Sequence, residues 1–478
     1  MKKFRRVFLI VLALALAGII SSVKWNEPWY HFRPIGSWLV EYGDGPGNYK
    51  PSPEADSALR QMGSNAVPYL LKLLHSTNSY SYYTFVSKPR LRFYSGSPGT
   101  WNRLSTWWIN TRYRFQRVTV SPGRDHWTAY LAFQALGPEA KSAIPDLIKL
   151  ANDPSANSTP SGTAVSFWKN RKVVASFAAR SSNLSPDGIP LFPPKVGAAF
   201  WSVPTPFLRD GEIAAWSLAA IGADSVPLLT QMLTNSAPQL RYRAAVALGM
   251  MGKPAEPAVP VLLKMLADPD FKTRQEAAEA LGCIGEKPHL VVPALMKFLE
   301  NKDMGFYPIE TPDAHMEVYA IESLGAFGER ATNAIPALLT VFQTQYNSRD
   351  QTIGQYMIGY VALALNKISP ELTRKEVIPL LISRIQNPKS PWNQSMTLNT
   401  LGQMTNQPDL VIPILLDALD STDKTTRIYT FIELGGFDSA AKAAVPKLVF
   451  FSTSQDTNLC RLATNALDKI EPGWRTGN

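Results

Sequence analysis

The sequence predicts an all-α protein, built as a right-handed solenoid of stacked helical hairpins with two irregular insertions. Two observations lead to this prediction: one pattern recurs along the chain, and its apolar residues repeat with the period of an α-helix. In each copy a helix ends in Leu-Gly, a second glycine follows, and an aliphatic residue with a proline opens a Leu-rich helix. Because one hairpin cannot bury its apolar stripe alone, successive hairpins are expected to stack.

The prolines that open the second helices measure the repeat. From Pro227 onward, successive prolines are separated by either roughly 33 or roughly 43 residues, which are repeat lengths typical of helical-hairpin arrays. The two earlier intervals are about twice as long, so we expect an insertion within each of them. The anchoring prolines are Pro68, Pro145, Pro227, Pro260, Pro293, Pro336, Pro379, Pro413 and Pro446.

The hairpins between residues 243 and 300 show the expected packing. Leu281 belongs to the apolar stripe of a first helix and is predicted to be buried between hairpins. Glu276 and Glu279 share another face of that helix and are expected to face solvent. Gly282 and Gly285 are expected to let the chain leave the helix and pack closely at the turn. The stripe of the preceding second helix consists of Val259, Leu262, Leu263 and Leu266.

These residues resemble the HEAT-repeat family, especially its short bacterial variety, which is also found in phycobilin lyases. The resemblance covers roughly residues 53–470 and implies a HEAT- or armadillo-like superhelix. Asp270 with Arg274, and Asp423 with Arg427, occupy equivalent positions in two repeats, and the resemblance implies that they cross-link neighbouring repeats. A spacing of about 33 residues also suits ankyrin and tetratricopeptide repeats, but their turn and Trp/Tyr patterns are absent.

Composition and repeats together divide the chain into five segments. The first is a signal peptide or N-terminal membrane anchor, the second a linker, and the other three contain the repeats and insertions. The predicted bounds are 1–23 for the signal or anchor, 24–52 for the linker, 53–150 for N-terminal repeats with a basic aromatic insertion at 75–126, 151–210 for a Ser-, Pro- and aromatic-rich insertion, and 211–478 for contiguous repeats ending in a cap helix.

The N-terminus has the pattern of an export signal. The basic segment Met1 to Arg6 is followed by an uninterrupted apolar run from Val7 to Ile20. This run is shorter than the roughly 20 residues that span a bilayer, and it fits the hydrophobic region of a signal peptide. We therefore expect an exported protein that is periplasmic or extracellular, or that is anchored to the membrane by an uncleaved N-terminal segment.

The net charge of +10 is concentrated in the N-terminal segment and the two insertions. The insertion at 75–126 holds eight basic residues against one acid. A helix over residues 101–117 would separate an apolar face from a basic face, and that basic face is predicted to bind an anionic partner. In the alternative interpretation the arginines are only solvated. The predicted binding residues are Arg103, Trp107, Arg114 and Arg117.

No motif for catalysis, metal binding or a cofactor is found in the sequence, so an enzyme is not predicted. The five histidines stand alone, and the two cysteines, Cys283 and Cys460, are far apart. We predict a scaffold for protein–protein interaction at or outside the cell envelope, with an unidentified protein partner. The alternative is binding of an anionic polymer (polysaccharide, nucleic acid or lipid headgroups) through the basic insertion. A helical-repeat enzyme of the lyase or DNA-glycosylase type is less favoured.

Overall fold

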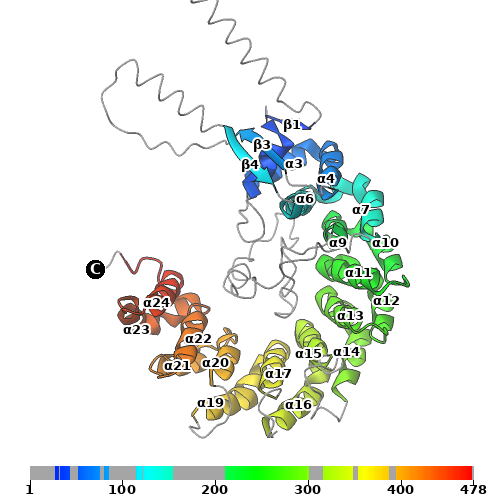
Figure 1. The fold of residues 1–478 in the computed structure, drawn as a ribbon. Coiled ribbons are helices and arrows are strands. Elements are labelled where there is room, and N and C mark those ends of the chain that lie inside the picture. Colours follow the sequence, from blue (N-terminus) through cyan, green and yellow to red (C-terminus); the bar gives the residue numbers. More distant parts are fainter. Residues whose placement is uncertain are drawn as a thin grey trace, which may run out of the picture. The chain divides into compact units, whose positions relative to one another are not determined.

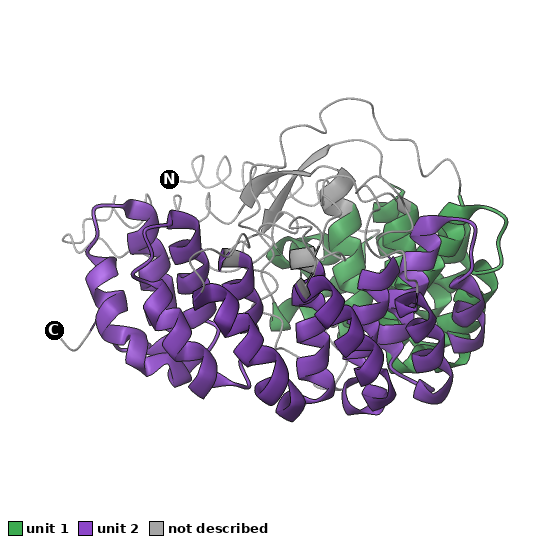
Figure 2. Cartoon of the chain, turned by 90° about the horizontal axis from the view of Figure 1, so that it is seen from below, with its two compact units in different colours: residues 1–258 green, residues 259–478 purple. Residues whose placement is uncertain are grey.

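The computed structural model is predominantly helical, as Figure 1 shows, and confirms the predicted all-α solenoid. Its described residues fall into two compact units, residues 1–258 and 259–478 (Figure 2). None of the described helices has both the length and the apolar character needed to span a membrane. The structure describes residues 27–31, 33–42, 52–75, 80–85, 115–120, 122–153, 210–300, 316–347, 354–386 and 394–475.

In its described residues the first unit contains hairpins of two helices and two small antiparallel sheets of two strands each. Short 3₁₀ turns join the two helices of a hairpin, with the anchoring proline in the first turn of the second helix. The elements are β1 (Trp29–Tyr30), β2 (Arg33–Pro34), α2 (Ile35–Leu39), η1 (Val40–Tyr42), α3 (Pro53–Met62), η3 (Gly63–Ala66), α4 (Val67–Leu74), β3 (Tyr80–Phe85), β4 (Phe115–Val120), α6 (Pro122–Leu136), η4 (Gly137–Ala143), α7 (Ile144–Ala151), α9 (Asp210–Ile221), η9 (Ala223–Ser225), α10 (Val226–Met232), α11 (Pro238–Met251) and η10 (Lys253–Ala258).

Part of the segment expected as a linker is folded against the first repeat. Trp38 and Tyr42 are buried, and the Tyr42 hydroxyl donates a hydrogen bond to Asp56 on α3. The Arg33 guanidinium lies 3.7 Å from the centre of the Trp38 ring and forms a 2.8 Å ion pair with Glu41. Residues 33–42 therefore belong to the folded body of this unit.

The helix predicted from Trp101 to Arg117 is wrong at its C-terminal end. Residues Phe115–Val120 form strand β4, which pairs antiparallel with Tyr80–Phe85 in β3. Both segments are rich in aromatic and β-branched residues, which favour a strand over a helix. Residues 101–114 lie outside the described part of the chain.

The repeats on either side of the predicted insertion at 151–210 are packed directly together. Helix α7 contacts α9, and the Arg243 guanidinium on α11 donates a 2.8 Å hydrogen bond to the Ala151 carbonyl. Arg243 is 2% exposed, and a side chain at Gly211 would collide with it. The stack of helices is therefore continuous across this interruption of the repeat.

In the second unit the helices form two rows. The first helices of successive hairpins, α13, α15, α17, α20, α22 and α24, pack side by side, and the second helices form the other row (Figure 1). The elements are α12 (Val259–Met265), α13 (Phe271–Ile284), α14 (Pro288–Met296), η11 (Lys297–Leu299), α15 (Met316–Ala326), η13 (Gly328–Ala334), α16 (Ile335–Asn347), α17 (Gly354–Ile368), α18 (Pro370–Leu372), the π-helical turn η14 (Thr373–Val377), α19 (Ile378–Gln386), α20 (Gln394–Gly402), α21 (Pro408–Ala418), α22 (Lys424–Leu434), η15 (Asp438–Ala444), α23 (Val445–Ser452) and α24 (Thr457–Ile470).

The core between the rows is formed by the predicted stripes, except that Leu263 is only partly buried. Leu281 is fully buried, as predicted, and so are Val259 and Leu262 of the preceding second helix. Helix α13 ends at Gly285, whose left-handed φ of +64° is easily adopted only by glycine. The apolar spacing read from the sequence therefore gives the correct register of this hairpin.

Asp270 and Asp423 cap the first helices of their own repeats. Asp270 accepts a 2.8 Å hydrogen bond from the backbone N–H of Thr273, and Asp423 accepts one of 2.7 Å from Thr426. A carboxylate at this position satisfies an N–H group that the helix leaves unpaired. Cross-linking of neighbouring repeats, which the resemblance implied for these aspartates with Arg274 and Arg427, stays a prediction. Other ion pairs do join neighbouring repeats. In this unit they include Lys424–Asp456 at 2.8 Å and Lys447–Asp420 at 2.7 Å.

Candidate functional site

The predicted basic binding surface falls largely outside the described residues. Arg103, Trp107 and Arg114 lie there, and Arg117 lies in β4, of which only the backbone is described. In a strand, side chains alternate between two faces with a period of two residues. The helical face that was expected to hold Arg117 together with the other three residues therefore does not extend to it.

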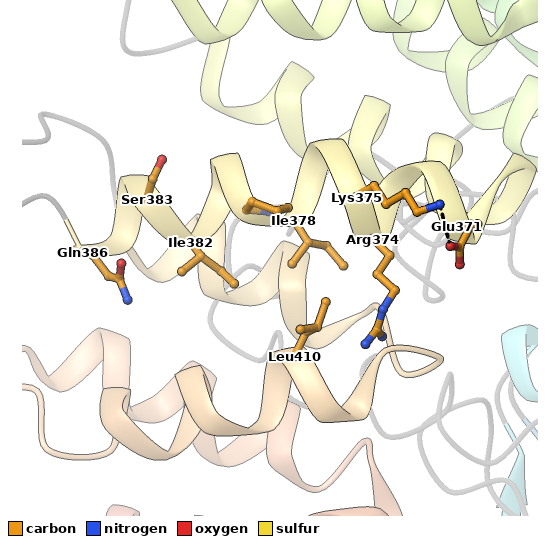
Figure 3. Close-up of a pocket in the computed structure, with 9 residues that line it drawn as sticks. Glu371, Arg374, Lys375, Ile378, Ile382, Ser383, Gln386 and Leu410 are labelled. Carbon is orange, nitrogen blue, oxygen red and sulfur yellow. Dashed lines mark ion pairs between the residues drawn. The ribbon is translucent and has the colours of Figure 1, made fainter.

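The second unit has a groove along its second row of helices, with a volume of about 430 Å³. One wall is the continuous helix formed by α18, η14 and α19, and Leu410 on α21 contributes to the other (Figure 3). Ile378 and Ile382 point from α19 towards Leu410, so the centre of the groove is apolar. A groove of this size can hold a few side chains of another molecule.

The residues along the α19 wall follow one line of the helix. Arg374, Ile378, Ile382 and Gln386 are spaced by four residues, which places them on one side of a helix. The groove therefore has an apolar middle and polar ends. The same spacing is visible in the sequence, but there it cannot be distinguished from an apolar stripe that belongs to the core.

The charged end of the groove is held in place by ion pairs. The Arg374 guanidinium forms a bidentate ion pair with Asp409 and donates a further hydrogen bond of 2.9 Å to Gln407. The hydrogen bond from Arg374 lowers the pKa of the Asp409 carboxyl. Lys375 forms an ion pair of 3.0 Å with Glu371. Because Arg374 and Lys375 are already paired, the apolar centre is the main part of the groove that can contact another molecule.

A π-helical turn, Thr373–Val377, carries the two cations at this end. Such turns interrupt the regular α-helical hydrogen bonding and occur often at functional sites. Here the turn brings Arg374 within reach of the neighbouring hairpin, where Asp409 lies in the first turn of α21. The groove is thus closed at one end by a fixed contact between two adjacent repeats.

The groove offers binding but no evident catalytic arrangement. Ser383, its only described hydroxyl, donates to the Leu380 carbonyl at 2.8 Å and lies 3.3 Å from the Tyr346 hydroxyl, with no basic partner in those contacts. Across the part of the chain that the structure describes, no three His, Cys, Asp or Glu side chains are arranged to hold a metal ion.

Comparison with known proteins agrees with this architecture. The family described as HEAT repeats matches residues 212–282, which run from α9 to α13. This chain contains HEAT repeats. The resemblance read from the Leu-Gly and proline pattern is confirmed.

Several solved structures resemble the chain at low sequence identity. The complex of CpcE and CpcF of phycocyanin lyase from Nostoc sp. PCC7120 is 20% identical, covers 61% of this chain and 96% of that chain, and gives a TM-score of 0.34. A crystal structure of importin beta is 14% identical, covers 93% and 58%, and gives 0.41. Yeast importin-beta is 11% identical, covers 89% and 48%, and gives 0.39. None of the curated proteins matches the chain. At these TM-scores the similarities carry no information on activity or partners.

The HEAT repeats of the second unit also bury carboxylates that were expected in solvent. Glu279 on α13 is only 4% exposed, so the expectation that it faces solvent is wrong. Glu276, on the same helix, and Glu322, on α15, are partly buried. Spacing alone could not reveal this, because it shows which residues share a helix face and not which neighbouring helix covers that face.

Proposed function

We propose that this protein is an exported HEAT-repeat scaffold that binds another protein at or outside the cell envelope, and that it works by binding and not by catalysis. The groove between α19 and α21 is the observation that supports protein binding most directly. Its apolar centre lies between repeats, where an extended or helical segment of a partner can bury aliphatic side chains. The basic and then apolar N-terminus supports export.

The partner segment that fits this groove is apolar in its middle. Ile382 and Leu410 are partly exposed in the free chain, and contact with a partner would remove them from water. Arg374 is fixed by Asp409, so it orders the end of the groove and is not free to clamp an anion. We therefore assign the binding energy to aliphatic contacts at Ile382 and Leu410.

The experiment is capture of envelope proteins by the full chain, with proteins identified by mass spectrometry. The variant Ile382→Asp with Leu410→Asp places two charges in the groove and is expected to lose the captured partner. Leu290→Asp is the matched control, because Leu290 is 46% exposed on α14, outside the groove. A partner retained equally by all three proteins would exclude the groove as its binding site.

Binding of an anionic polymer through the basic insertion is the second proposal. It rests on the excess of eight basic residues over one acid between residues 75 and 126. Neutralisation of phosphate, sulfate or carboxylate groups makes such binding strongly dependent on salt. Aliphatic contacts in the groove depend little on salt, so the salt dependence of retention distinguishes the two proposals.

A further inference from the structure

Three glutamates lie on the first helices α13 and α15, which pack against each other. On α13, Glu276, Glu279 and Cys283 follow the spacing i, i+3, i+7 and lie along one side of the helix. On α15, Glu322 lies three residues after Tyr319 and directly precedes Ser323, which is in contact with Gly282 of α13. We call Glu276, Glu279 and Glu322 the glutamate cluster.

The centre of the glutamate cluster is a carboxylate oxygen without a partner. Glu279 is 4% exposed, and its Oε1 atom is buried with no hydrogen-bond partner among the described residues. Buried polar atoms are nearly always hydrogen-bonded, because leaving one unpaired is costly. Glu276 and Glu322 remain partly exposed, so the cluster is still in contact with solvent. The unpaired Oε1 atom of Glu279 is therefore available to accept a hydrogen bond from a donor.

The charges around the cluster leave Glu279 without a described compensating cation. Burial raises its pKa to about 9, and the neighbouring Glu276 and Glu322 contribute to that rise through like charge. The pKa of Glu276 is raised to about 8 and that of Glu322 to about 7, in both cases mainly by burial. Cations lower the pKa only at the edges of the cluster, with Lys272 acting on Glu276 and Lys367 on Glu322. Two other titratable side chains, Cys283 and Tyr319, have their pKa values raised by the charges of Glu276 and Glu279. Tyr360 in turn contributes to the raised pKa of Tyr319.

We propose that the glutamate cluster is a binding site for a cationic nitrogen group, either an ammonium or a guanidinium. Such a group supplies both the positive charge and the several N–H donors that three carboxylates accept. A metal ion is a poorer fit, because it needs several ligand atoms at bonding distance from one point, and no three His, Cys, Asp or Glu side chains of the described residues are arranged in that way. The N–H donors of an ammonium or guanidinium point in different directions, so each can reach a different carboxylate. The cation can come from a free amine or from a lysine or arginine of a partner. Only the second source rests on the proposed scaffold function.

Binding at this site is coupled to proton release. With pKa values of about 7 to 9, the three carboxyls hold protons near neutral pH when the site is empty. A cation favours their ionised forms and displaces those protons, so its affinity rises as the pH increases from 7 to 9. An amine of pKa about 10.4 stays charged over this range. Carboxyls with the ordinary pKa of 4.5 are already ionised at pH 7 and give no such dependence.

The test measures binding of two probes to the full chain by calorimetry at pH 7, 8 and 9. Spermidine represents a free amine, and a fluorescein-labelled decalysine peptide represents a partner side chain. The test variant combines Glu276→Gln, Glu279→Gln and Glu322→Gln. The control variant combines Glu300→Gln, Glu329→Gln and Glu376→Gln, which changes the net charge equally at three exposed positions of the same unit.

We expect at least one probe to bind the wild type and the control variant about tenfold more tightly at pH 9 than at pH 7. At pH 9 the test variant should bind that probe at least tenfold more weakly than the wild type does. Spermidine binding would show that a free amine suffices, whereas binding of the peptide alone would assign the cation to a protein partner. The proposal is overturned if neither probe binds, if the test variant binds like the control, or if wild-type binding does not change with pH. If the test variant is poorly folded, the change of wild-type affinity between pH 7 and pH 9 still tests the proposal. Because the groove is not part of this experiment, its outcome is independent of the capture experiment with Ile382 and Leu410.

Discussion

Gly282 of α13 and Ser323 of α15 lie in direct contact, and a Cβ atom at Gly282 would be only 2.8 Å from the Cα atom of Ser323. The Ser323 hydroxyl donates a 2.8 Å hydrogen bond to the Ala278 carbonyl on α13, which fixes the same close approach. Gly325 repeats this relationship one hairpin later, where a Cβ atom would lie 3.0 Å from the Cα atom of Ala364. The Leu-Gly element of the repeat thus serves the close packing of successive first helices.

The first prediction concerns this contact. Gly282→Ala should destabilise the second unit by about 1–3 kcal/mol, because the added methyl group meets backbone that cannot move without shifting a helix. The melting temperature, followed by circular dichroism, should fall by several degrees.

Gly435→Ala is the matched control. It stands at the equivalent Leu-Gly position of α22, but there the nearest atom to an added Cβ is at 3.4 Å, an ordinary contact. Its φ of −66° is also suitable for alanine. This substitution should leave stability unchanged or raise it slightly, since alanine favours the helix by roughly 1 kcal/mol over glycine. Equal melting temperatures for the two variants would show that the contact at Gly282 is not tight.

The repeat was predictable because its signals are local. The proline that opens a second helix and the leucines that follow it act within their own helix, and Leu281 lies in the core as their spacing required. The roles of the two glycines were only partly predicted. Gly285 ends α13 through its positive φ, whereas Gly282 lies inside the helix and faces α15. Which glycine serves which purpose depends on the neighbouring hairpin.

The candidate sites were not predictable in the same way. The apolar line through Ile378 and Ile382 resembles a core stripe, and only the position of Leu410 on another hairpin makes it a groove. Glu279 has the same spacing from Glu276 as any solvent-facing pair, and its burial is a property of the assembled row of helices. Packing between repeats, and not the pattern within one repeat, therefore determines both sites.

The second prediction tests the register of the stack. Leu281→Asp places an unpaired charge in fully buried apolar packing and should cost several kcal/mol. Leu290→Asp, at an exposed position on α14, should change stability by less than about 0.5 kcal/mol. Thermal or denaturant unfolding of the two variants checks this. If both unfolded like the wild type, the assignment of Leu281 to the core would be incorrect.

The third prediction concerns export. A reporter enzyme that is active only outside the cytoplasm, fused to the C-terminus, should be active, and deletion of residues 2–23 should abolish that activity. The reason is that the basic segment followed by the apolar run from Val7 to Ile20 is what the export machinery recognises. An inactive reporter on the full-length chain would contradict export. Release of the fusion into the soluble extracytoplasmic fraction would distinguish cleavage from anchoring.

The fourth prediction concerns the basic insertion. Changing Arg103, Arg114 and Arg117 together to Glu should leave the melting temperature nearly unchanged, because the repeat pattern does not require arginine at these positions. The same change should lower the salt concentration at which the protein elutes from a heparin column, since it reverses three charges in the most basic stretch. Unchanged elution would exclude these arginines from anion binding, and a large loss of stability would assign them a structural role.

The last prediction concerns the pH dependence of stability. The folded chain holds protons on Glu276, Glu279 and Glu322 at pH values where the unfolded chain releases them, since burial raises all three pKa values above the ordinary 4.5. Their contribution to the free energy of unfolding is therefore fully present below about pH 4.5 and is lost progressively as the pH rises to about 9.

Replacing the three glutamates with glutamine removes this dependence, because glutamine does not titrate. The difference in melting temperature between the triple glutamine variant and the wild type should accordingly grow in favour of the variant from pH 5 to pH 9, by several degrees in total. The control variant at the exposed positions 300, 329 and 376 should follow the wild-type curve, because it removes the same number of carboxyls from positions that are not buried. Parallel curves for the wild type and the test variant would mean that the three carboxyls are ionised in the folded protein, and that Glu279 has found a compensating partner of its own.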